Sequence, residues 1–181
     1  GKHNLENIQA AVNVCLSLDV KEEAVLKALM SFKGAAKRLQ PLFISADTKI
    51  YLDFAHAPSK VAATVSAIKA QYPGLKLITI LELHTYSSLN KDFLPQYAHA
   101  LDPADEAVVF YNKHTLEIKR MPDLDPAFII EQFKKPELKI FTQNEQLAAF
   151  LNQINKQNKV ILFMSSGTFN GVDIKSWANS I

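Results

Sequence analysis

The stretch Ile50-Tyr51-Leu52-Asp53-Phe54-Ala55-His56-Ala57-Pro58 decides the fold class of this chain. Its first three residues are a short apolar strand pattern. Pro58 suits the first turn of a helix, because the N–H that proline lacks has no partner at that position. The stretch therefore predicts a strand-to-helix junction, with Asp53 and His56 at the carboxyl end of the strand, where α/β sheets bind ligands.

Around this junction, strand patterns rich in Val, Ile and Leu alternate with amphipathic helix patterns. We expect strands at 77–81, 107–111, 138–141 and 160–164, and helices at 58–72, 93–101, 127–133, 145–154 and 172–177. Upstream, 42–44 and 50–52 predict a hairpin, and 115–126 predicts a loop because it contains prolines and several acidic residues. Near-continuous apolar strands between helices are typical of a parallel sheet with both faces covered. The predicted fold class is α/β: a Rossmann-like, mostly parallel sheet covered by helices, with a hairpin strand.

A short helical segment precedes this sheet. Residues 4–18 carry apolar residues at helical spacing, with Asn4 placed to cap the helix. Asp19 followed by Glu22 has the pattern of a capping box for a second helix. Cys15 shares the apolar face of the first helix, so we expect a buried, inert thiol.

Composition limits the class of protein. The chain has 181 residues, enough for one domain or one domain plus part of another, and a net charge of only +2. Its basic pairs are scattered, so nothing favours nucleic-acid binding. The single cysteine excludes an internal disulfide and fits a reducing compartment. No apolar run reaches membrane-spanning length and no signal peptide is visible, so we expect a cytoplasmic protein without a membrane partner.

Polar residues gather directly after the predicted strands. They are Asp53 and His56, Glu82 and His84, Asn112 to His114, and Ser165 to Thr168. Because the carboxyl ends of parallel strands meet at one edge of a sheet, we expect these groups to surround a shared crevice. The sequence has no phosphate-binding G-x-x-x-x-G-K-[ST] loop, no G-x-G-x-x-G, no HExxH or CxxC, and no G-x-S-x-G. No metal ligands are predicted.

Several of these residues also have an ordinary structural interpretation. Ser165 and Ser166 suit the cap of the last helix or, with Gly167, a backbone nest for an anion. Phe169 suits packing as well as substrate contact, and Glu82 suits pairing with a lysine.

Three motifs in sequence order resemble the Mur ligase family, whose members join amino acids or peptides to UDP-N-acetylmuramate precursors of the bacterial cell wall. They are Gly1-x-His3-Asn4-x-x-Asn7 with Ala10-Ala11, Phe32-x-Gly34-x-x-Lys37-Arg38-Leu39, and Asp53-Phe54-Ala55-His56-Ala57-Pro58. The first is similar to the end of the central ATPase domain and the second to its junction with the C-terminal domain. The resemblance implies that residues 1–36 are a truncated helical end of the central domain and that 37–181 are the C-terminal α/β ligase domain.

The resemblance also implies the nucleotide contacts. Asn4 and Asn7 would read the adenine, since a carboxamide both donates and accepts hydrogen bonds. Arg38 would bind phosphate oxygens, and Asp53 would contact the ribose side of ATP. Mg²⁺ would be bound mainly by an upstream domain, and the present residues alone would be inactive because they lack the phosphate loop.

For the substrates, the resemblance implies that His56 is the catalytic residue, near the incoming amine. His84, Ser165, Ser166 and Phe169 would bind substrate. The partners implied are UDP-N-acetylmuramate, an amino-acid or peptide acceptor, and the chain's own upstream central and N-terminal domains.

Two features bear on the acceptor. The run from Met164 to Gly171 is similar to that of the branch that recycles a murein tripeptide, and His84-Thr85-Tyr86 lacks the arginine usual in the alanine-adding branch. Both favour a ligase that joins a murein tripeptide to UDP-N-acetylmuramate in peptidoglycan recycling. The alternatives are an L-alanine ligase of peptidoglycan synthesis and a non-catalytic nucleotide-binding α/β module.

Overall fold

The computed structural model describes residues 2–32 and 37–180, with side chains from residue 5 onward. The chain divides into two compact units, Gly1–Ala35 and Ala36–Ile181. Among the described residues, no helix has the length and apolar character needed to cross a membrane.

The first unit consists of α1 (Lys2–Ser17) and α2 (Glu22–Ser31). The predicted N-caps are wrong, because α1 begins before Asn4 and α2 is preceded by Lys21, which makes no side-chain cap bond. Asp19 instead adopts a left-handed backbone conformation, with φ 59°. Cys15 is half-buried rather than buried. The predicted buried face is therefore only partly present in this unit.

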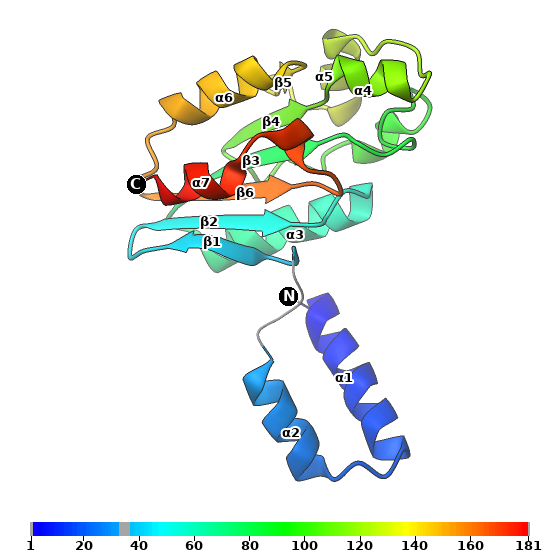
Figure 1. Cartoon of the computed structure of the whole chain (residues 1–181), viewed down its shortest axis with the longest axis vertical. Coiled ribbons are helices and arrows are strands. Elements are labelled where there is room, and N and C mark those ends of the chain that lie inside the picture. Colours follow the sequence, from blue (N-terminus) through cyan, green and yellow to red (C-terminus); the bar gives the residue numbers. More distant parts are fainter. Residues whose placement is uncertain (1, 33–36, 181) are drawn as a thin grey trace. The chain divides into compact units, whose positions relative to one another are not determined.

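The second unit is a six-stranded sheet with the order β1-β2-β6-β3-β4-β5 (Figure 1). The strands are β1 (Gln40–Ile44), β2 (Thr48–Asp53), β3 (Lys76–Glu82), β4 (Glu106–Phe110), β5 (Lys139–Phe141) and β6 (Lys159–Met164). The strands from β2 to β5 in this order run parallel, whereas β1 pairs antiparallel with β2 as the predicted hairpin. The predicted fold class is confirmed.

Helices cover both faces of this sheet. They are α3 (Pro58–Gln71), α4 (Lys113–Ile118), α5 (Pro126–Phe133), α6 (Asn144–Gln153) and α7 (Ile174–Asn179), with 3₁₀ turns η1 (Leu94–Tyr97) and η2 (Phe169–Gly171). One apolar core holds residues of α3, η1, α4 and α5, and a second holds residues of α6 and α7. In Figure 1, α7 lies in front of the sheet and α3 behind it. Successive side chains of a strand point to opposite faces of the sheet, so Leu81 lies in the first core and Ile80 in the second.

The connection that follows β6 lies on the opposite face of the sheet from the connections that follow its neighbours β2 and β3. The connections after β2 and β3 lead into the first core, through α3 and η1, whereas the connection after β6 leads through η2 to α7 in the second core. Because β6 lies between β2 and β3, the loops at its carboxyl end separate from those of both neighbours. In open α/β sheets this topological switch point is where ligands bind.

Three predicted elements differ from the structure. The helix expected at 93–101 is only η1, because the backbone leaves helical geometry at Ala98 (ψ 128°) and at the left-handed His99 (φ 63°), although most of its apolar residues are buried. The loop expected at 115–126 begins with helical residues of α4, which Asn112 caps by accepting a hydrogen bond from the His114 N–H. The last helix begins later than expected, at Ile174, with Asp173 as its cap.

Asp105, just before β4, links α3 to β3 at the amino end of the parallel strands. Its carboxylate accepts hydrogen bonds from the Leu77 N–H and the Lys69 ammonium, both at 2.6 Å. Partial burial acts to raise the pKa of Asp105, but these two bonds outweigh it and hold the pKa below its ordinary value. The folded state therefore gains stability from this ionised carboxylate.

We expect Asp105→Asn to lower the free energy of unfolding by about 1–2 kcal/mol at pH 7, toward the low end of the effect of hydrogen bonds to a charged group because the carboxylate is partly exposed. The carboxylate is 37% exposed, so screening keeps the ion-pair share small. Since the folded pKa is the lower one, the difference from wild type should be full above the unfolded value, 3.8, and vanish as the pH falls through the folded value. Urea unfolding from pH 7 to pH 3 measures it. Asp102→Asn, at a more exposed carboxylate, is the control.

Candidate functional site

The carboxyl ends of β2, β6 and β3 lie side by side. Met164 at the end of β6 is in register with Asp53 on β2 and with Leu81 on β3. The residues that follow these positions therefore start from one edge of the sheet, as the sequence predicted. We refer to the ends of β2, β6 and β3 and the residues after them as the switch edge.

Asp53 organises the β2 side of the switch edge. It is only 9% exposed, and each carboxylate oxygen accepts a backbone hydrogen bond: Oδ1 from the Ala55 N–H and Oδ2 from the Leu39 N–H, both at 2.7 Å. Its own carbonyl accepts from the Ser165 N–H at 3.0 Å. Asp53 thus joins the segment before β1, the turn before α3 and the loop after β6. Each oxygen keeps a second lone pair with which it can accept from a ligand.

Arg38 precedes Leu39, so the Asp53 carboxylate fixes the backbone beside it. The Arg38 side chain is exposed, as is that of Asn7 on α1. The Asn4 side chain lies outside the described residues. Since Asn4 and Asn7 belong to the first unit and Arg38 and Asp53 to the second, the predicted nucleotide contacts are divided between the two units.

His56 has one ring nitrogen bonded to the backbone of its own turn. Its Nδ1 is 2.8 Å from the Phe54 carbonyl oxygen, which can only accept, so Nδ1 carries the hydrogen and Nε2 is left for other partners. The Phe54 ring contacts the imidazole edge-on, with centroids 5.1 Å apart. The buried Tyr97 hydroxyl donates to the His56 carbonyl, and burial raises the pKa of Tyr97 well above its usual range, which keeps this donor protonated.

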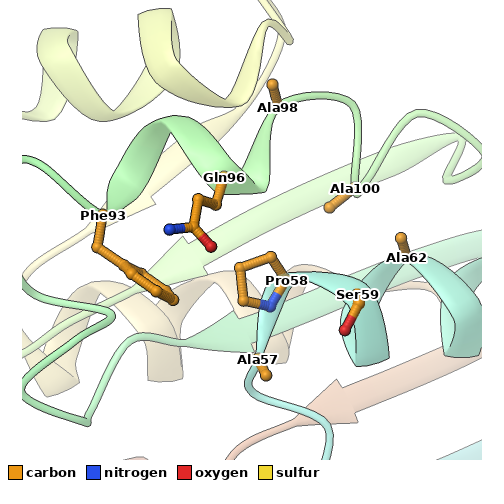
Figure 2. A pocket seen from close by; sticks show the side chains of 8 residues that line it. All are labelled: Ala57, Pro58, Ser59, Ala62, Phe93, Gln96, Ala98 and Ala100. Atoms are coloured by element: carbon orange, nitrogen blue, oxygen red, sulfur yellow. The ribbon is translucent and has the colours of Figure 1, made fainter.

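A shallow hollow of about 430 Å³ lies between the start of α3 and η1 (Figure 2). In Figure 2 the side chains of Phe93 and Gln96 point toward Pro58. The hollow begins at Ala57, directly after His56, but none of the predicted site residues lines it. It is a neighbour of the switch edge and not its centre.

The loop after β6 contains three of the predicted substrate residues. Ser165 is buried, donates its hydroxyl hydrogen to the Glu82 carboxylate and accepts from the Gly167 N–H at 2.7 Å, so its side chain is occupied within the protein. Ser166 Oγ is buried without a hydrogen-bond partner among the described residues. Of the two serines, Ser166 is the one whose hydroxyl has no hydrogen-bond partner among the described residues, which is unusual for a buried polar group.

Phe169, for which the resemblance implied substrate binding, has its side chain in the second core. Its ring is only 2% exposed and packs against Phe110 and Phe163, with centroids 6.4 and 5.6 Å apart. The apolar residue type indicated packing equally well, and the second core is where the ring lies.

On the β3 side, His84 and Glu82 lie together. His84 is 40% exposed, and its Nδ1 is 3.8 Å from Glu82 Oε1. Glu82 is only 3% exposed and receives hydrogen bonds from Ser165 and from the Phe169 N–H. Pairing with a lysine, as its sequence suggested, is not what this carboxylate does. In the sequence, only the position of Glu82 after an apolar strand indicated that it belongs to this edge of the sheet.

Further along the same edge, the polar residues after β4 have structural roles. Asn112 caps α4, and the exposed His114 lies 3.1 Å from Glu117. Throughout the described residues no group of three or more His, Cys, Asp or Glu side chains could hold a metal ion. These residues therefore do not fit a Mg²⁺ site by themselves, and we derive no step through that ion.

Comparison with known proteins gives the family. A family profile described as "Mur ligase, glutamate ligase domain" matches residues 37–167. The UDP-N-acetylmuramate–L-alanine ligase of Nitrosomonas europaea is 30% identical over 175 residues, which are 93% of this chain and 37% of that protein. The corresponding ligase of Ruthia magnifica is 25% identical over 174 residues, 92% of this chain and 37% of that protein.

Solved structures have the same fold. A UDP-N-acetylmuramate–alanine ligase from Thermotoga maritima superposes with a TM-score of 0.69 at 23% identity, covering 94% of this chain and 36% of that one. A murein peptide ligase from Psychrobacter arcticus gives a TM-score of 0.66 at 20% identity, covering 100% of this chain and 38% of that one. The chain therefore spans well under half the length of the curated relatives named above. Since the profile covers most of the second unit, the chain belongs to the Mur ligase family through its glutamate ligase domain.

Proposed function

We propose that this chain is the C-terminal part of an ATP-dependent amide ligase that extends UDP-N-acetylmuramate. The observation that carries the proposal is Asp53 at one edge of the sheet: its carboxylate holds the Arg38 segment and the His56 turn, and its backbone carbonyl holds the loop of Ser166. A switch point with a buried carboxylate, histidines and an unpartnered hydroxyl suits a polar ligand with a reacting amine.

In this proposal ATP transfers its γ-phosphoryl group to the carboxylate of UDP-N-acetylmuramate and leaves as ADP. The acceptor amine then attacks the resulting acyl phosphate, forming the amide and releasing phosphate and a proton. The present residues contribute alignment and charge rather than covalent chemistry. Arg38 binds phosphate oxygens, and His56 lies near the amine with its Nε2 available. Mg²⁺ is assigned to upstream residues, in a domain that also supplies the phosphate loop.

For the acceptor we favour L-alanine, because curated relatives at 25–30% identity carry that name. The second candidate is a murein tripeptide. The run Ser165-Ser166-Gly167-Thr168-Phe169-Asn170-Gly171 and the Thr at position 85 favour it. We place the ligase in the cytoplasm, in keeping with a single, unpaired Cys15.

The test is a competition between acceptors. The full-length ligase, ATP and UDP-N-acetylmuramate are mixed with equal concentrations of L-alanine and L-alanyl-γ-D-glutamyl-meso-diaminopimelate, and the amide products are counted by mass spectrometry. We expect the L-alanyl product to dominate. Excess tripeptide product would replace the favoured acceptor by the second candidate, and no amide from either would favour a non-catalytic nucleotide-binding module.

We also expect residues 1–181 alone to release no phosphate from ATP, because the sequence contains no phosphate loop. Phosphate release is measured with and without both substrates, and the full-length ligase is the positive control. If residues 1–181 alone released phosphate, and Asp53→Asn abolished this release, the assignment of the phosphate loop to an upstream domain would be contradicted.

A further inference from the structure

Glu82 is the most deeply buried carboxylate at the switch edge. It ends β3 and is 3% exposed, beside the central strand β6. Burying a charge is costly unless hydrogen bonds compensate for the lost water. A carboxylate retained at this position therefore has a specific set of partners.

Those partners lie in the loop after β6, far away in sequence. Glu82 Oε2 accepts from the Ser165 hydroxyl and, at 2.9 Å, from the Phe169 N–H. Ser165 Oγ in turn accepts from the Gly167 N–H at 2.7 Å. One carboxylate oxygen thus sets the path of the loop through a short chain of hydrogen bonds.

This loop has a strained backbone. Phe169 and Asn170 both have left-handed conformations, with φ of 52° and 50°. Such conformations are unfavourable for residues other than glycine, and persist only where their surroundings enforce them. The buried Phe169 ring and the bond from its N–H to Glu82 are what enforce this one.

The other carboxylate oxygen, Oε1, faces His84, 3.8 Å from its Nδ1. The contact between His84 and Glu82 also depends on the lack of a side chain at Gly167. A Cβ at Gly167 would lie 2.8 Å from His84 Cγ and 2.9 Å from Glu82 Oε2, too close for either group to stay where it is. The absence of a side chain at this position lets the imidazole, the carboxylate and the loop pack together.

Ser166 lies between Ser165 and Gly167, and the hydrogen bonds of the Ser165 hydroxyl hold both of these neighbours in place. Its buried Oγ has no partner among the described side chains and backbone groups, so its placement follows from its two neighbours. Glu82 consequently controls two groups that are left for a ligand: the half-exposed ring of His84 and the hydroxyl of Ser166.

We propose that Glu82 is a positioning residue that sets His84 and Ser166 for the acceptor in the ligase reaction. This inference rests on the proposed function. Glu82 itself touches no substrate in it, since its bonds are satisfied within the protein. Nucleotide binding, which we assign to Arg38 and Asp53, does not depend on it.

The test uses the full-length ligase and measures KM for the acceptor and for ATP separately. We expect Glu82→Leu, which removes both acceptor oxygens, to raise KM for the acceptor at least about 10-fold, as for a lost hydrogen bond, while KM for ATP stays within about twofold. Glu82→Gln keeps an oxygen for Ser165 and Phe169, so it should recover most of the loss. Glu106→Leu, at the start of β4 on the opposite edge, is the matched control and should leave KM for the acceptor unchanged.

The inference would be overturned if folded Glu82→Leu kept the wild-type KM for the acceptor. It would also be overturned if KM for the acceptor and KM for ATP rose equally. If Glu82→Leu does not fold, Ser165→Ala and Gly167→Ala decide: a selective rise in KM for the acceptor supports the inference, and wild-type values in both overturn it. A wild-type ligase that forms no amide with either acceptor is a different result. It refutes the proposed function, and the inference falls with it.

Discussion

Asp53→Asn in the full-length ligase is expected to lower kcat about 100-fold, the size of effect that a displacement of about 1 Å in a reacting group produces. The side chain of Asn has a single oxygen, whereas the N–H groups of Leu39 and Ala55 each use a separate oxygen of Asp53. Whichever way the amide is turned, one N–H faces an NH₂ group and the segment of Arg38 or the turn of His56 moves. Single-turnover phosphate release is the measurement.

Asp47→Asn is the control for this variant. Asp47 lies in the exposed turn at the opposite end of β2, where its carboxylate accepts from the Ser45 hydroxyl. We expect it to keep wild-type kcat. Circular dichroism and urea unfolding check that Asp53→Asn is folded, with a loss of about 1–3 kcal/mol for the unpaired N–H. A folded Asp53→Asn enzyme with wild-type kcat would contradict the role of this carboxylate.

Arg38→Ala should lower kcat/KM for ATP about 100–1,000-fold, the range for removing a group that stabilises charge in a transition state. The side chain is exposed, and the backbone beside it is fixed by Asp53, so the change removes a charged group without disturbing a core. Steady-state kinetics with ATP as the varied substrate measure the effect.

Arg38→Lys separates charge from geometry. Lysine keeps the charge but loses the planar fork that binds phosphate oxygens in pairs, so we expect only part of the loss to be recovered. Arg120→Ala removes an exposed arginine after α4 and is the control for net charge. Equal kinetics in Arg38→Ala and Arg120→Ala would mean that Arg38 is an ordinary surface charge.

The sheet was predictable from the sequence because its signals are local. Runs such as Val160 to Met164 are fully apolar, and each is buried between helices on both faces. The residues of 93–101 show the limit of such patterns. Leu94 and Tyr97 are buried as helical spacing requires, but the backbone reaches this burial with a 3₁₀ turn and a left-handed His99. Periodicity therefore predicts well which residues are buried. It predicts less well the backbone conformation that these residues adopt.

The site was predicted in part for the same reason. Asp53, His56 and His84 follow apolar strands, and strand ends meet at one edge. The partners of Glu82 were not predictable, because the residues that satisfy its carboxylate are more than eighty positions away along the chain. The place of Phe169 was not predictable either: its ring packs in the second core, and its N–H donates to Glu82.

The most direct measurement of the central claim, that the switch edge is the reaction centre of an amide ligase, is phosphate release by the full-length enzyme. UDP-N-acetylmuramate and ATP are supplied with L-alanine or with the tripeptide, and wild type is compared with Asp53→Asn. We predict one phosphate for each amide formed with at least one acceptor, and formation of both products about 100-fold more slowly in Asp53→Asn. Amide formation at the wild-type rate in Asp53→Asn, or no phosphate with either acceptor in wild type, would contradict the claim.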